Sequence, residues 1–302
     1  MPAQYSLKEL IEKERECVMV PCIYDCGSAL AAELSGAKAV LLSGGELAES
    51  LLGCIEPMLT TDEVVHSVER ICNFTKLPVI VDVGAGYESP LSAYRTTKRL
   101  VAAGAGAILL GNEKDMEWEE YKALLKSALK GTEGSSCIVI ARKNGLLDTD
   151  EAVEECIAQL TEAVELGAAG TMACGLCRTN RSRELAKVIG SRVPGWKIYP
   201  DQNSVNGVPD VCNEEIYESG FVMISYHYMM KAAVAAMWQY GLLNMANKNN
   251  VASNELPFPN GIQGASALPV FNMQRLLDLE AEFTGIRRIF KVPGAIEGRE
   301  NG

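Results

Sequence analysis

Short, continuously apolar runs alternate with amphipathic stretches between residues 17 and 243. Such runs are typical of strands in a parallel sheet that is covered by helices on its outer face. Eight strand–helix units predict a (β/α)₈ barrel of the TIM type, with a doubly wound open sheet as the alternative. The predicted strands are 17–21, 39–42, 78–82, 107–110, 136–141, 170–173, 196–200 and 221–225, and the predicted helices are 29–35, 62–74, 93–103, 118–129, 150–166, 183–189, 214–219 and 228–243.

The pattern changes near residue 247. Residues 247–268 are polar and rich in Asn, Pro and Gly, which is typical of a linker, whereas 271–283 carry apolar residues at helical spacing. A helix separated from the barrel must bury its apolar face elsewhere, and a partner subunit is the simplest place. We therefore expect a barrel over residues 1–246, and a linker with a C-terminal helix over 247–302.

Composition narrows the class of protein. Hydrophobic residues make up 48% of the chain and charged residues 22%, so a large core is available and disorder is disfavoured. The formal net charge of −11 argues against a nucleic-acid partner, although local Arg residues and backbone N–H groups can still bind a small anion. No run reaches the roughly 18 apolar residues of a membrane helix, and no signal-peptide core is present. With ten scattered cysteines, best interpreted as reduced thiols, these features predict a cytoplasmic protein without a membrane partner.

Candidate site residues follow the predicted strands, because a barrel of this kind places its site at the carboxyl ends of the strands. Ser43, Gly44 and Gly45 follow the second strand, and consecutive backbone N–H groups there can hold a carboxylate. An ordinary turn is the competing interpretation. Asp82 ends the third strand, where it can bind a divalent cation or a substrate hydroxyl, or cap the strand end.

Arg142 follows the fifth predicted strand. Its guanidinium can hold a carboxylate through two hydrogen bonds at once. The structural alternative is a salt bridge to Glu56 or Asp82, and the sequence leaves both open.

Later strand ends supply fewer signals. Cys174 can be a nucleophile, a proton donor or, with Cys177, a soft-metal ligand, but small buried polar residues fit the same spacing. Asp201 and His227 also lie near predicted strand ends. His227 can titrate near neutrality, and a polar residue that closes the last strand is the simpler interpretation.

Three stretches together resemble the isocitrate lyase / phosphoenolpyruvate mutase superfamily, with methylisocitrate lyase-like features. They are VPCIYDCGSALAAELSGAKAVLLSGGELAES, LTTDEVVHSVERICNFTKLPVIVDVGAGYE and YRTTKRLVAAGAGAILL, and ARKNGL stands where the family has Ala-Arg-Thr-Asp. The resemblance covers residues 20–243. It implies a TIM-type barrel, a small carboxylate ligand, Mg²⁺, no organic cofactor, and a homodimer or homotetramer.

The resemblance also assigns roles to matching positions. It implies that the substrate carboxylate is bound by the backbone of the Ser-Gly-Gly loop and by Arg142, and that Asp82 is the first Asp of the metal motif. Glu56 stands where the family usually has an Asp. The predicted substrate-binding residues are Tyr24, Ser43, Gly44, Gly45, Arg142 and Asp201, and the predicted catalytic residues are Asp82, Glu56 and Cys174.

Several family positions are replaced. The second Asp of the metal motif is Gly84, and the Lys-x-Cys-Gly-His loop of the lyases is missing between Asn112 and Trp118. Asp82 is then the one inherited ligand for Mg²⁺, a cation that prefers six oxygen ligands. The other replacements are Glu88 for Gly, Gly111-Asn112 for Glu-Asp, Asn144 for Asp, Cys174 for Glu, and Asp201 and Ser204 for Asn and Glu.

These features predict a carbon–carbon lyase-like enzyme that acts on a small 2-oxo or 2-hydroxy carboxylate through an enolate-type intermediate. The first alternative is a non-catalytic carboxylate-binding or partner protein that has lost the metal site. The second is a barrel enzyme resembling ketopantoate hydroxymethyltransferase, which the Tyr-Asp opening and the Ser-Gly-Gly loop disfavour.

Overall fold

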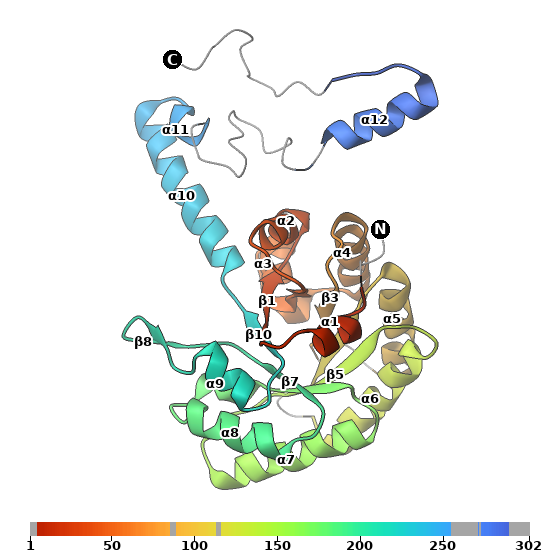
Figure 1. Ribbon diagram of the computed structural model, residues 1–302, viewed down its shortest axis with the longest axis vertical. Coiled ribbons are helices and arrows are strands. Elements are labelled where there is room, and N and C mark those ends of the chain that lie inside the picture. The colour runs from red at the N-terminus through yellow and green to blue at the C-terminus, as the bar shows by residue number, and fades with distance from the viewer. Residues whose placement is uncertain (1–4, 85–88, 113–115, 255–270, 272, 290–302) are drawn as a thin grey trace. The chain divides into compact units, whose positions relative to one another are not determined.

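Eight parallel strands close into a barrel in the order β1-β10-β7-β6-β5-β4-β3-β2, which confirms the predicted fold class (Figure 1). The computed structural model describes residues 5–84, 89–112, 116–254, 271 and 273–289. Each barrel strand lies beside the barrel strands that precede and follow it in the sequence, and the β8–β9 hairpin forms a separate sheet between β7 and β10 in chain order. The barrel strands are β1 (Val18–Ile23), β2 (Val40–Leu42), β3 (Val79–Asp82), β4 (Ala107–Gly111), β5 (Ile138–Lys143), β6 (Gly170–Ala173), β7 (Trp196–Tyr199) and β10 (Met223–Tyr226).

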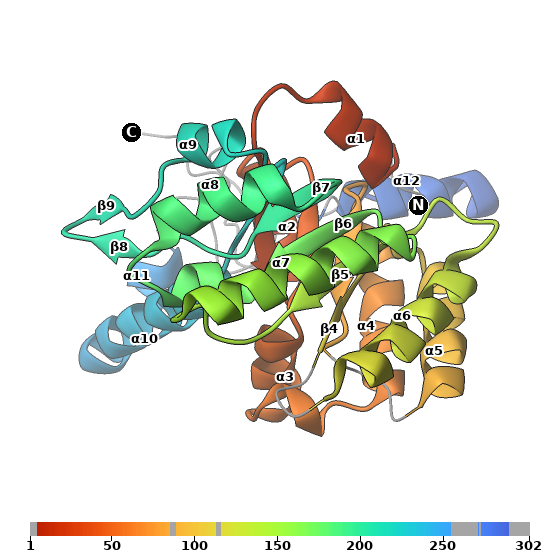
Figure 2. The ribbon, with the colours of Figure 1, turned by 90° about the horizontal axis from the view of Figure 1, so that it is seen from below.

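Helices lie outside the strands, as Figure 2 shows from a second direction. A short antiparallel hairpin, β8 (Ser204–Val205) with β9 (Val208–Pro209), interrupts the chain after β7. The helices are α1 (Leu7–Lys13), α2 (Cys26–Leu34), α3 (Gly44–Leu52), α4 (Thr61–Phe74), α5 (Pro90–Ala103), α6 (Trp118–Thr132), α7 (Asp150–Glu165), α8 (Ser182–Arg192), α9 (Asn213–Glu218), α10 (Met229–Asn247), α11 (Val251–Asn254) and α12 (Met273–Thr284), with 3₁₀ turns η1 (Glu56–Met58) and η2 (Cys174–Arg178).

Helix α3 is the main difference from the predicted elements. The sequence predicts a loop there, because two adjacent glycines have low helix propensity. In the structure Ser43 caps the helix, its Oγ accepting a hydrogen bond from the Glu46 N–H at 3.3 Å. Leu47 and Ala48 are fully buried. The cap and this burial together outweigh the weak propensity of the glycines.

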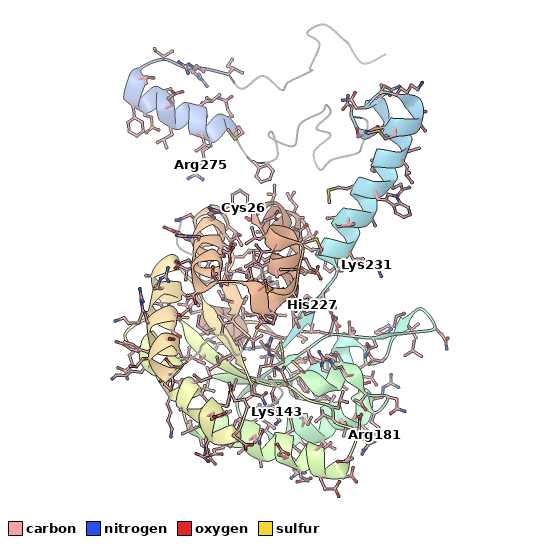
Figure 3. The ribbon with its side chains drawn as sticks, turned by 180° about the vertical axis from the view of Figure 1, so that it is seen from behind. Cys26, Lys143, Arg181, His227, Lys231 and Arg275 are labelled. Atoms are coloured by element: carbon pink, nitrogen blue, oxygen red, sulfur yellow. The ribbon has the colours of Figure 1, made fainter. Side chains whose placement is uncertain are left out.

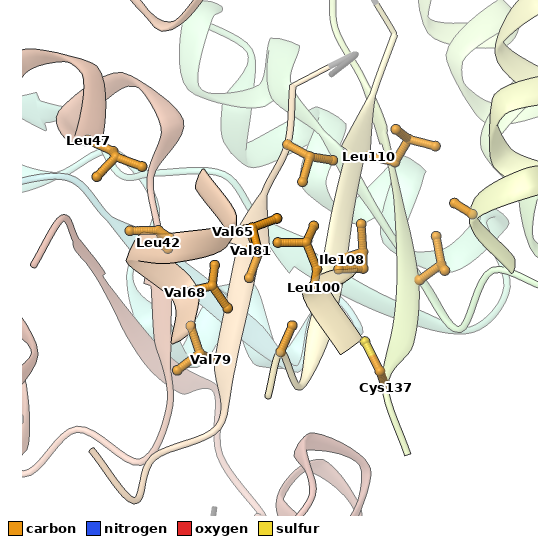
Figure 4. Packing of buried hydrophobic residues seen from close by; sticks show 14 of the residues in the cluster. Leu42, Leu47, Val65, Val68, Val79, Val81, Leu100, Ile108, Leu110 and Cys137 are labelled. Atoms are coloured by element: carbon orange, nitrogen blue, oxygen red, sulfur yellow. The ribbon is translucent and has the colours of Figure 1, made fainter. Parts of the chain in front are cut away.

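Side chains alternate along each strand between the barrel interior and the helices. Val81 and Ile108 face outward and pack with Val68 of α4 and Leu100 of α5 (Figure 4). The interior positions carry the other set, which includes Val20, Leu41, Ile80, Leu109, Ile140 and Met172. Because the period is two, the next interior position beyond this layer lies at the carboxyl end of each strand. Those next positions are Asp82 on β3, Gly111 on β4, Arg142 on β5 and, directly after β6, Cys174.

The chain divides into two compact units, Met1–Met230 and Lys231–Gly302. The division of the sequence at residues 246 and 247 stays a prediction. Helix α12 lies where the sequence predicts a C-terminal helix, and residues 255–268 of the predicted linker lie outside the described residues. Within the described ranges, no helix combines the length and the apolar character needed to cross a membrane.

Replacing Gly190 by Ala tests the close contact between α8 and the chain that enters β10. A Cβ at this position would overlap the Ser219 carbonyl and lie 3.3 Å from the Phe221 ring. Because backbone atoms cannot rotate away, we expect Gly190→Ala to lower the free energy of unfolding by about 1–3 kcal/mol. Urea denaturation measures the change.

Gly241→Ala is the matched control, since Gly241 lies within α10 and nothing surrounds its Cβ position within 4 Å. This variant should be neutral, or more stable by about 0.5–1 kcal/mol, through helix propensity alone. Equal stability of Gly190→Ala and the unmodified protein would contradict the packing described here.

Candidate active site

A cavity of about 1910 Å³ opens at the carboxyl ends of the barrel strands. Its floor includes the interior residues Leu41, Leu109 and Met172, and its walls come from the loops that follow the strands. Both charge signs line it, which suits a polar anion better than an apolar ligand. The charged side chains and the histidine in the lining are Glu56, Asp82, Glu117, Arg142, Lys143, Glu155, Arg178, Asp201 and His227.

A buried ion pair joins Arg142 to Asp82 on this floor. The Arg142 Nη1 donates to Asp82 Oδ2 at 2.5 Å, and the two side chains are only 12% and 11% exposed. Burial lowers the pKa of Arg142, but the charges of Asp82 and Glu56, together with the hydrogen bond to Asp82, act in the opposite direction, so the net pKa is raised and the guanidinium stays charged. The Nε atom is buried without a hydrogen-bond partner among the described residues. Of the alternatives that the sequence leaves open for Arg142, the salt bridge to Asp82 is therefore present.

Glycine at position 111 makes room for this guanidinium. A Cβ on Gly111 would lie 2.7 Å from both Nε and Nη2 of Arg142. Contacts that short are not tolerated, and the guanidinium is held in place by its ion pair. The side-chain space of residue 111 is thus occupied by Arg142.

Two amides connect the loops after β4 and β5. The backbone N–H of Asn144 donates to Asn112 Oδ1 at 2.7 Å, and the Asn144 side-chain amide donates to the Asn112 carbonyl at 2.6 Å. The resemblance places carboxylates at both positions. Neutral amides can form this mutual pair, whereas two carboxylates would repel each other.

The described residues do not fit a divalent cation. One oxygen of Asp82 accepts from Arg142 and the other from the Gly84 N–H at 2.9 Å, so both oxygens are engaged within the protein. Neither Gly84 nor Gly111 has a side chain. No group of three or more His, Cys, Asp and Glu side chains suitable for a metal occurs in the described part of the chain, and Glu88 lies outside it. Mg²⁺ would lack the carboxylate oxygens it prefers.

The N-terminus of α3 is covered by a carboxylate of the chain itself. Gly44 lines the cavity, and a Cβ placed on it would overlap the Glu56 side chain. Ser43 is buried as the helix cap, and neither it nor Gly45 lines the cavity. Since a helix N-terminus attracts anions, Glu56 lies where the sequence predicts a bound substrate carboxylate.

The Tyr-Asp opening motif has a clear structural role. Asp25 and Ser28 form a capping box at the start of α2, with Ser28 N–H donating to Asp25 Oδ1 at 2.7 Å. The Ser28 hydroxyl also accepts from the Tyr24 N–H at 3.0 Å. Tyr24 is half-buried, and burial raises the pKa of its phenol, but it is not among the residues that line the cavity.

Cys174 and Cys177 both line the cavity at the end of β6. Burial raises the pKa of Cys174 to about 11, so its thiol is protonated at neutral pH. The Cys177 thiol donates to the Cys174 carbonyl at 3.2 Å, within the 3₁₀ turn η2. The raised pKa of Cys174 disfavours the thiolate form that a nucleophile needs.

His227 lies in the cavity, whereas the simpler interpretation of the sequence is a polar residue that closes the last strand. His227, labelled in Figure 3, follows β10, and its Nδ1 lies 3.2 Å from Oδ2 of Asp201, which follows β7. The hydrogen bond to Asp201 raises the pKa of His227 against the opposing effect of burial. The sequence signal for this position is the period of two along β10, which makes Met223, Ser225 and His227 successive interior residues.

Comparisons with known proteins identify the family. A sequence profile described as phosphoenolpyruvate phosphomutase matches residues 7–242. The chain is 28% identical to the chloroplastic carboxyvinyl-carboxyphosphonate phosphorylmutase of Arabidopsis thaliana over 73% of this chain and 68% of that protein. It is also 28% identical to the 2-methylisocitrate lyase of Aeropyrum pernix, over 73% and 72% respectively.

A solved structure agrees at the level of the fold. The crystal structure of 2,3-dimethylmalate lyase, a PEP mutase/isocitrate lyase superfamily member, superimposes with a TM-score of 0.80 at 24% identity, covering 93% of this chain and 95% of that one. Because the profile spans most of the chain, the protein belongs to the phosphoenolpyruvate phosphomutase family, as a divergent member.

Proposed function

We propose that the protein is a carbon–carbon lyase-like enzyme that acts on a small 2-oxo or 2-hydroxy carboxylate through an enolate-type intermediate. One observation carries the proposal: Arg142 is charged, lines the cavity, and has a buried Nε donor with no hydrogen-bond partner in the described part of the chain. A buried donor of this kind costs free energy unless a ligand supplies the acceptor. A substrate carboxylate is the acceptor that a guanidinium binds best.

The charge of Arg142 also fits the chemistry of an enolate. Cleavage of a bond next to a carbonyl leaves negative charge on the carbonyl oxygen, and a fixed cation beside that oxygen stabilises the transition state. In this chain the cation is a side chain already held by Asp82. We therefore propose that carboxylate binding needs no divalent metal, although the superfamily resemblance implies Mg²⁺.

We further propose that the protein forms a homodimer or homotetramer in the cytoplasm. Large apolar side chains of the second unit are exposed, including Trp238 at 69% and Phe283 at 80%. Exposed apolar groups of this size support an interface between copies. All ten cysteines are free, which suits a reducing compartment.

Analytical ultracentrifugation should give a mass of two or four chains, and a monomer at micromolar concentration would contradict the oligomer.

Oxalate tests the carboxylate site without requiring turnover. At about 100 times its dissociation constant, a ligand adds roughly 2.7 kcal/mol of stability, which thermal denaturation detects as a higher Tm. We expect the same shift with EDTA and with added Mg²⁺. Arg142→Ala should abolish the shift, because the guanidinium supplies the charge that holds the ligand.

Arg192→Ala is the matched control, since Arg192 is an exposed arginine whose ion pair with Glu154 lies outside the cavity. It should keep the full shift. A shift that requires Mg²⁺ would contradict the metal-free proposal, and no shift under any condition would contradict the carboxylate site itself.

Glu56→Gln tests whether the chain's own carboxylate competes with the ligand. Two like charges about 4 Å apart repel by about 1 kcal/mol even in bulk water and by more in a partly buried site, so neutralising one should lower the oxalate dissociation constant by at least about fivefold. Isothermal titration calorimetry measures the change. Glu117→Gln, at another position on the cavity wall, should alter affinity far less. Weaker binding by Glu56→Gln would mean that Glu56 contacts the ligand productively.

A further inference from the structure

Two acid–base side chains, His227 and Asp201, lie together on a part of the cavity wall that the proposed carboxylate site does not use, and the buried Glu46 is electrostatically coupled to His227. His227 follows β10, Asp201 follows β7, and Glu46 projects from α3. The first two line the cavity and lie 3.2 Å apart, Nδ1 to Oδ2. The ring nitrogen that faces Asp201 is thereby fixed, which leaves Nε2 as the free proton-transfer atom.

Glu46 is buried and does not accept the backbone N–H that an acid at its position in a capping box would accept. Ser43 and Glu46 have the spacing of a capping box, in which the acid accepts the cap's backbone N–H. Here the Ser43 N–H donates instead to the Ile23 carbonyl at 3.0 Å. The Glu46 side chain is therefore released from the helix terminus. It is 9% exposed, and its Oε2 has no hydrogen-bond partner among the described residues.

The charges of Glu46 and His227 are coupled. Burial raises the pKa of Glu46, and the nearby imidazolium of His227 opposes that rise. A buried carboxylate next to a histidine favours the protonated ring. Glu46 and Asp201 thus face His227 from different elements, α3 and the segment after β7.

Arg142 and His227 lie on different walls of one cavity. In the barrel order, β7 and β6 stand between β10 and β5, so the two residues face each other across the mouth rather than along one edge. A short carboxylate held at Arg142 then directs its other end away from β5. The carbon next to its 2-oxo group is the atom that an acid–base residue must reach.

We propose that His227, oriented by Asp201, carries the proton to and from the carbon beside the 2-oxo group of the substrate. This inference rests on the proposed function. In the exchange direction, Nε2 of neutral His227 removes a proton from that carbon. The C–H electron pair forms the C=C bond and the carbonyl π electrons move to oxygen as an enolate. In the cleavage direction the imidazolium returns the proton to the enolate carbon. Asp201 and Glu46 are positioning residues, because they act through the ring.

The pH dependence follows from the groups around the ring. Asp201, Glu46 and Asp82 all favour the imidazolium, and burial opposes them. Proton removal requires the neutral ring, so the exchange rate should rise with pH through the pKa of His227, which is raised above its ordinary value. Asp201→Asn should move this rise to lower pH, since it removes the largest stabilising partner.

Exchange of the methyl protons of pyruvate in D₂O, followed by ¹H NMR, tests the proposal directly. We expect the unmodified protein to catalyse exchange, and His227→Gln to slow it by about 10²- to 10⁴-fold, the range for loss of a general acid or base. The matched control is His66→Gln. His66 is the other histidine of the chain and lies exposed on α4. This variant should exchange at the unmodified rate.

Oxalate binding separates the failure of this inference from failure of the proposed function. His227→Gln should keep the oxalate-induced shift in Tm, because Arg142 is intact. Exchange by His227→Gln at the unmodified rate would overturn the role of His227, as would oxalate binding without any exchange in the unmodified protein. Absence of both binding and exchange would reject the proposed function, and this inference with it. In the His66→Gln background, NMR titration of the one remaining imidazole should show a lower pKa after Asp201→Asn, and an unchanged pKa would refute the pairing.

Discussion

The buried ion pair between Arg142 and Asp82 is the constraint on which the rest of the cavity depends. A buried charge is tolerated only when it is paired and its remaining hydrogen bonds are satisfied. Asp82 meets this condition through the guanidinium and the Gly84 N–H. Arg142 meets it only in part, because Nε has no partner within the described ranges. The pair therefore fixes the position of a positive charge in the cavity.

Most of the fold was predictable because its causes are local and repeated. Apolar runs of strand length, amphipathic helices and the glycines between them recur along the chain, and each expected barrel strand is found near its expected position. The site residues at strand ends followed from the same rule, since parallel strands that close into a barrel bring their carboxyl ends together. Arg142 and Asp82 could be placed near each other for this reason alone.

The remainder depended on contacts that no sequence pattern specifies. Helix α3 begins at two glycines, and only the burial of its next turn decides that it is a helix. The Ser43-x-x-Glu46 spacing is typical of a capping box, but the Ser43 N–H donates to the Ile23 carbonyl instead of to Glu46. The pairing of Asp201 with His227 joins residues 26 positions apart through two separate loops. Family resemblance gives no help at such positions, because fold and chemistry vary independently.

The alternation of side chains along the barrel strands has a consequence for how such a protein diverges. Several strands carry packing residues in one layer and charged residues in the next, two positions further along, as Ile80 and Asp82 do on β3 and Ile140 and Arg142 on β5. Substitutions in the upper layer leave the lower layer's contacts intact, so stability and chemistry are under nearly separate selection. A lineage can exchange a set of carboxylates for glycines and amides without refolding the barrel. The chain thus keeps the barrel fold beneath an upper layer that carries glycines and amides at several positions where the resemblance places carboxylates.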